Sequence, residues 1–102
     1  MDARYFKEQI LEELEGAKCY VKNAIEIKAM DAEWGKMFLE MSAAELDHAA
    51  KLWKMFEKYY RIMSDTYKSG VPEYIEDMHK EIVQKYPETV AKVKYMHEMY
   101  NK

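Results

Sequence analysis

Apolar residues recur every three or four positions along almost the whole chain, and only one stretch interrupts this pattern convincingly. Such spacing places the apolar side chains on one side of an α-helix, whereas a half-buried strand needs strict alternation. The break is the segment 64–72, which contains the Ser, Asp, Gly and Pro typical of turns. With only 3 Gly and 2 Pro among 102 residues, little else limits helix length. We therefore predict an all-α protein of long helices in a single domain, residues 1–102.

The first predicted helix covers residues 3–30 and begins after Asp2, a residue type that caps helix N-termini. Asp31 can cap the second helix, residues 32–65, in the same way. Because the junction between them is so short, the two helices are expected to form a long antiparallel hairpin. Such a hairpin cannot cover its own apolar faces and needs further helices. Residues 72–100 continue the helical pattern, and Pro87 either kinks one helix or begins another.

Composition and charge exclude several classes of partner. The formal net charge of −3 argues against nucleic acid or an anionic membrane as the main partner. No segment approaches the roughly 18 uncharged apolar residues of a membrane span, and the N-terminus has no signal-peptide pattern. Cys19 is the single cysteine, which rules out an internal disulfide framework and favours a reducing compartment. We expect a cytoplasmic protein.

Ionisable residues interrupt the apolar stripes of the predicted hairpin. Glu45 and His48 are three positions apart and therefore share one face of the second helix. Glu13 lies on an inward stripe of the first helix. Burying a carboxylate and an imidazole without a partner is costly, so a positive charge is expected there. The apolar residues at helical spacing around the second-helix pair are Trp34, Phe38, Met41, Leu52, Met55, Phe56 and Tyr59.

The hairpin geometry predicts that Glu13 and Glu45 lie at the same level. Glu13 precedes the turn by about 17 residues and Glu45 follows it by about 14, and each helical residue adds about 1.5 Å. His48 lies one turn beyond Glu45 on the same face. Two carboxylates and an imidazole at one level are a ligand set that suits iron, manganese or zinc.

These residues resemble a known superfamily. Glu13 and Tyr20 on one helix, followed by Glu45-x-x-His48 on the next, are similar over residues 8–60 to the ferritin-like superfamily, including rubrerythrins, bacterioferritins and the short encapsulated ferritins. In that superfamily a four-helix bundle holds two metals with two single Glu ligands and two Glu-x-x-His pairs. The resemblance implies that Glu13 and His48 are terminal ligands, that Glu45 bridges, and that Tyr20 is a nearby hydrogen-bonding or redox residue. It also implies iron as cofactor, with ferroxidase or peroxide- or oxygen-scavenging activity.

One chain supplies only half of such a ligand set. The other Glu-x-x-His is Glu76-Asp-Met-His79, and Lys94 stands where the family would place a Glu before His97. Glu76 and His79 are further candidate metal ligands, in an accessory site or over the main one; the alternative is a partly exposed pair near a helix start. Two hairpins about a two-fold axis supply four carboxylates and two histidines. We therefore expect a homodimer, or a higher homo-oligomer, with the di-metal site between subunits.

Other functions fit the same residues. A metal-free helical module could bind a partner through faces rich in the nine Met and nine Tyr, and a degenerate ferritin-like fold could hold zinc only structurally. His97 is expected to be a packed or interfacial histidine, and Cys19 a buried structural thiol. The chain has no Cys-x-x-Cys pair, so the rubredoxin-type iron site of rubrerythrins is not expected.

Overall fold

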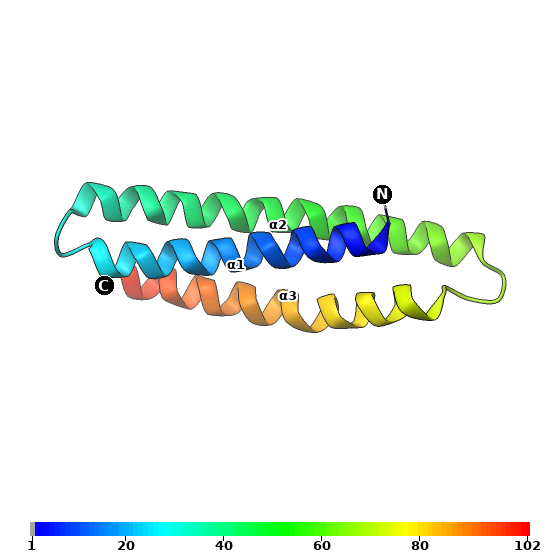
Figure 1. Ribbon diagram of the computed structural model, residues 1–102. Helices are drawn as coiled ribbons and strands as arrows, with labels where there is room; N and C mark the ends of the chain where they lie inside the picture. The colour runs from blue at the N-terminus through cyan, green and yellow to red at the C-terminus, as the bar shows by residue number, and fades with distance from the viewer. Residues whose placement is uncertain (1) are drawn as a thin grey trace.

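A computed structural model describes residues 2–102 as three long α-helices joined by short connections (Figure 1). Helix α1 is Ala3–Ile27, α2 is Ala32–Thr66 and α3 is Glu73–Tyr100. The first two form an antiparallel hairpin, and α3 returns along α1, so the C-terminus lies beside the turn between α1 and α2. The predicted all-α class and the hairpin are confirmed. In the described part of the chain, no helix combines the length and hydrophobicity that a membrane span requires.

Both predicted helix caps are present. The Asp2 carboxylate accepts a hydrogen bond from the backbone N–H of Tyr5 at 3.2 Å. The Asp31 carboxylate accepts one from the N–H of Trp34 at 2.9 Å. Each cap satisfies one of the N–H groups that a helix start leaves unpaired, so these two residues fix where α1 and α2 begin.

The third segment is a single helix that continues through a proline. Pro87 lies inside α3 and lacks the N–H that would bond to the carbonyl of Val83, one turn earlier. Both residues are exposed, so water can reach that carbonyl and the helix passes through. The sequence left open whether Pro87 lies within one helix or begins another. The structure has one helix, so the alternative of two short helices is wrong. The other boundaries differ slightly, since α1 ends at Ile27 and α2 at Thr66.

The core lies where α1 faces the other two helices. Its centre contains the stacked rings of Phe6 and Phe56, whose centroids are 5.7 Å apart. On α1 the buried residues are Ala3, Phe6, Ile10, Leu14, Ala17, Val21 and Ala24. On α2 they are Gly35, Ser42, Ala49 and Phe56, and on α3 Ile75, Ile82 and Val93. The α2 residues recur every seven positions, the period with which long helices stay in contact side by side.

Stacking between α2 and α3 sets how the third helix lies along the hairpin. The rings of Trp53 and Tyr86 lie parallel, with centroids 5.3 Å apart. Because the two helices run antiparallel, His48 is level with about residue 91 of α3. That part of α3 carries Val90 and Val93 and offers no second Glu-x-x-His.

A second line of residues on α2 is exposed. Trp34, Met41, Met55 and Ile62 are between 43% and 54% exposed, and they lie at multiples of seven positions from one another. His48 occupies the remaining place in this series and is also exposed. We call these five residues the exposed stripe. Helix α2 thus carries two neighbouring heptad lines, one buried in the core and one facing out.

Candidate metal centre

Glu13, Glu45 and His48 meet between α1 and α2. The His48 Nδ1 atom lies 3.5 Å from Glu13 Oε2 and 3.9 Å from Glu45 Oε1. One ligand atom from each of the three residues lies within 4.8 Å of the others. Within residues 2–102, no other group of three His, Cys, Asp or Glu side chains converges in this way. The level match predicted from helix lengths is confirmed.

The cluster lies near the surface of the single chain. The side chains of Glu13 and Glu45 are 23% and 26% exposed, whereas that of His48 is 53% exposed. The inward stripe predicted for these residues is therefore only partly covered, because α3 packs against a different side of the hairpin. The cluster adjoins the exposed stripe, of which His48 is a member.

Glu13 perturbs the titration of Glu45. When one of the pair is protonated, a hydrogen bond with Glu13 raises the pKa of Glu45, and partial burial and the negative charge of Glu13 raise it further. Nearby His48 acts in the opposite direction. The Glu13 Oε2 atom is buried, and no described residue donates a hydrogen bond to it. A buried acceptor without a donor, beside a second carboxylate, is an environment that a cation would stabilise.

The donor set fits a transition metal. Two carboxylate oxygens and one imidazole nitrogen are ligands that iron, manganese and zinc accept, and the spacing allows small side-chain movements to bring them onto one ion. Three protein ligands leave positions on the metal to be filled from elsewhere. The arrangement is therefore chemically suitable for a metal.

Tyr20 lies two turns beyond Glu13 on α1. It is half-buried, and its ring stacks on Phe38 of α2 with the centroids 6.3 Å apart. This contact helps to hold the hairpin together next to the cluster. A hydrogen-bonding or redox role for Tyr20 stays a prediction.

Glu76 and His79 lie in a different contact. The Tyr60 hydroxyl donates to Glu76 Oε1 at 2.7 Å, and His79 Nε2 lies 2.6 Å from Glu57 Oε1. The His79 ring also stacks on Tyr60 with the centroids 3.9 Å apart. Because Glu57 is nine residues beyond His48, this contact is about 13 Å further along α2. The structure thus places Glu76 and His79 between α2 and α3, and does not bring them to the cluster.

A buried polar contact joins all three helices. The Ser42 hydroxyl donates to the Ala17 carbonyl at 2.6 Å and lies 2.9 Å from His97 Nε2. Because the Ser42 hydroxyl proton is donated to the carbonyl, the Ser42 oxygen accepts from the N–H at His97 Nε2. His97 is therefore packed between the helices, one of the two positions predicted for it. Burial lowers the pKa of His97. This contact was not predicted from the sequence. The available signal was that Ser42 lies at seven-residue spacing from the buried Gly35 and Ala49.

Cys19 is exposed, so the predicted buried thiol is wrong. Its Sγ atom lies 3.7 Å from Glu15 Oε1 on the same helix. The side of α1 that faces the other helices passes through Ala17 and Val21, two positions before and after Cys19. A residue midway between them along a helix points away from that side.

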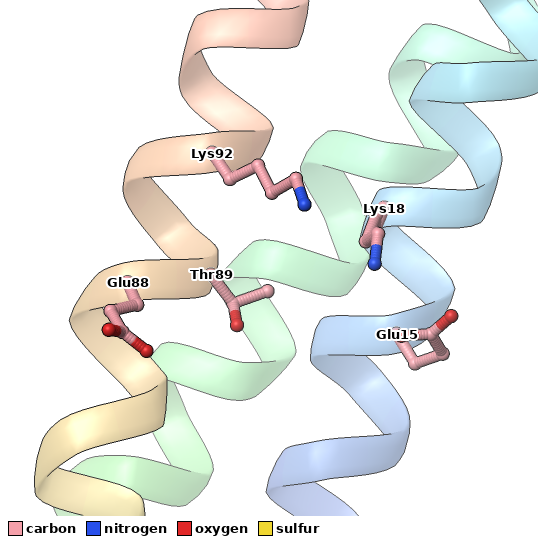
Figure 2. A pocket seen from close by; sticks show the side chains of 5 residues that line it. All are labelled: Glu15, Lys18, Glu88, Thr89 and Lys92. Carbon is pink, nitrogen blue, oxygen red and sulfur yellow. The ribbon is translucent and has the colours of Figure 1, made fainter.

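A hollow of about 300 Å³ lies between α1 and α3. Its lining residues are Glu15 and Lys18 on α1 and Glu88, Thr89 and Lys92 on α3 (Figure 2). The hollow carries two amines and two carboxylates at its rim, and most of these side chains are exposed. Because the rim carries charges of both signs, the hollow does not favour an anion or a cation. The Glu13, Glu45 and His48 cluster is therefore the stronger candidate site.

No protein-family model, no curated protein and no solved structure matches the chain. What the chain does is therefore inferred from the chemistry and placement of its own residues.

Proposed function

We propose that the chain binds divalent metal ions through Glu13, Glu45 and His48, and that two copies together form a di-metal centre of the ferritin-like kind. The observation that carries this proposal is the convergence of the three side chains, from two helices, within 4.8 Å. The buried Glu13 Oε2 atom supports it. His48 Nδ1 lies 3.5 Å from this oxygen without a hydrogen bond between them, and a bound cation would supply the missing partner.

The incomplete ligand set is the reason for a second copy. Helix α3 carries Val90 and Val93 at the level of His48, and the Glu76 and His79 side chains are engaged elsewhere. A two-fold axis beside the cluster would add a second Glu13, Glu45 and His48. The four carboxylates would balance two divalent cations, which makes burial of the charges tolerable.

The exposed stripe supports the same arrangement. Trp34, Met41, Met55 and Ile62 form an apolar heptad line on either side of His48. A heptad line is complementary to another helix of the same pattern, and a two-fold pair would bring the same surface from both copies together. Covering the stripe would also remove water from the metal ligands. We therefore propose a homodimer that contacts through this stripe.

A pair of iron ions bound in such a centre would catalyse the oxidation of ferrous iron by dioxygen or peroxide. This is the activity of a ferroxidase, or of an oxidoreductase that scavenges peroxide or oxygen. Glu13 and Glu45 would hold the ions and compensate their charge. Tyr20, two turns along α1, would donate a hydrogen bond or an electron. The packed exposed stripe would restrict access of water.

Titration with Mn(II), followed by the electron paramagnetic resonance signal of the free ion, tests the proposal. We expect one ion bound per chain, and a loss of affinity of about ten-fold or more in Glu45→Ala and in His48→Ala. The matched controls are Glu76→Gln and His79→Gln, which alter the other Glu-x-x-His and should retain affinity. Equal binding by Glu45→Ala and the unsubstituted chain would contradict the proposal.

Aerobic addition of Fe(II) then separates the redox proposal from a structural metal site. An oxidising centre should produce absorbance at 300–400 nm faster than buffer alone, and Glu45→Ala should abolish the difference. Binding without faster oxidation would leave a structural site, as for zinc. No binding at all, with an intact dimer, would favour the metal-free interaction module, for which the exposed stripe is the supporting observation.

A further inference from the structure

Gly16 lies in the middle of α1, where glycine is a poor choice for helix formation. Its backbone gives no reason for glycine, since Gly70 is the glycine with a positive φ in the described residues, at 100°. What distinguishes Gly16 is the space beside it. An added Cβ atom would lie 3.2 Å from Glu45 Oε2 and 3.6 Å from Glu45 Cδ and Cγ.

The three atoms nearest to an added Cβ at Gly16 belong to a single flexible side chain. At Gly35, by contrast, an added Cβ would meet the Tyr100 hydroxyl at 3.0 Å, the Lys28 Cα at 3.3 Å and the Ala24 carbonyl oxygen at 3.4 Å. Gly35 therefore allows elements of the fold to approach one another. At Gly16 the three nearest atoms all belong to Glu45.

We propose that Gly16 is a positioning residue for the metal centre: its missing side chain leaves a notch in α1 that seats the Glu45 carboxylate beside Glu13. Gly16 follows Glu13 by three positions, so both lie on the same side of α1. A methyl group in the notch would move the Glu45 carboxylate by a few tenths of an ångström or turn it toward solvent. This inference rests on the proposed metal binding at Glu13, Glu45 and His48.

The Gly16→Ala variant separates this role from a purely structural one, because the two effects have opposite signs. Without metal, alanine favours the helix and should raise the melting temperature by about 4 °C, less any crowding of Glu45. In a Mn(II) titration the same variant should bind about ten-fold more weakly. Cys19→Ala, an exposed change to a better helix former three positions later, is the control and should leave affinity unchanged.

A double-mutant cycle measures the interaction between position 16 and Glu45 in the absence of metal. In a Glu45→Ala background the notch is empty, so Gly16→Ala should raise the melting temperature more than it does when Glu45 is present. Equal rises in both backgrounds would overturn the inference. If Gly16→Ala does not fold by itself but folds with Glu45→Ala, the contact is supported; failure to fold in both overturns it.

The two proposals fail differently. If the unsubstituted chain binds Mn(II) and Gly16→Ala binds it equally well, the positioning role of Gly16 is wrong and metal binding stands. If the unsubstituted chain binds no Mn(II), the metal centre itself is wrong, and the double-mutant cycle reports only a packing contact.

Discussion

Replacing Glu45 with Gln should change stability in opposite directions with and without metal. Gln keeps the size of the side chain and removes its charge, so it relieves the repulsion between Glu45 and Glu13. The ligand atoms of the cluster lie within 4.8 Å of one another. At a separation of about 5 Å, two like charges repel by about 3 kcal/mol at an effective dielectric constant of about 20 and by under about 1 kcal/mol in water. With about a quarter of each side chain exposed, we expect a gain of about 1–2 kcal/mol.

The assay is thermal unfolding followed by circular dichroism at pH 8, chosen on the alkaline side because Glu13 and partial burial raise the pKa of Glu45. With a chelator, Glu45→Gln should melt about 5–10 °C above the unsubstituted chain. With Mn(II) at about 100 times the dissociation constant, the unsubstituted chain gains about 2.7 kcal/mol and the order should reverse. The control is Glu40→Gln, an exposed carboxylate on the same helix. A variant that melts higher under both conditions would refute the reasoning.

Three further changes test the fold around the centre. Phe56→Ala removes a fully buried ring and should lower the free energy of unfolding by about 3–5 kcal/mol in urea titrations; a loss under about 1 kcal/mol would contradict its place in the core. Ser42→Ala leaves His97 Nε2 without its buried partner and should lower the free energy of unfolding by about 1–3 kcal/mol. Because burial lowers the pKa of His97 below its ordinary 6.5, the unfolded chain binds a proton more readily, so stability should fall as the pH drops below about 6.5. His97→Gln keeps a donor to Ser42 and should flatten this part of the profile; an unchanged slope would contradict it.

Much of the hairpin could be predicted because helix geometry is nearly rigid. Asp2 and Asp31 marked both helix starts, since a carboxylate at that place satisfies unpaired N–H groups. A fixed rise per residue then brought Glu13 level with Glu45, and helical periodicity added His48 to the same face. The convergence of these residues follows from the position of one short turn, where Asp31 caps α2, and from regular helix geometry on either side of it.

The lateral packing could not be predicted in the same way. Which side of the hairpin α3 covers depends on how large side chains such as Trp53 and Tyr86 fit together, and periodicity does not specify this. For the same reason the sequence did not reveal that Glu76 accepts a hydrogen bond from Tyr60. The role of Gly16 depends on the close approach of α1 and α2, although a glycine inside a helical pattern was a visible signal.

The central claim is that two chains share one di-metal centre built from Glu13, Glu45 and His48. Native mass spectrometry of the protein after Mn(II) loading and desalting measures both parts of the claim at once. We predict a dimer that carries two Mn(II) ions, and a metal-free species for the Glu45→Ala variant under the same conditions. A folded monomer that retains its own ion, or a dimer whose ions persist in Glu45→Ala, would contradict the claim.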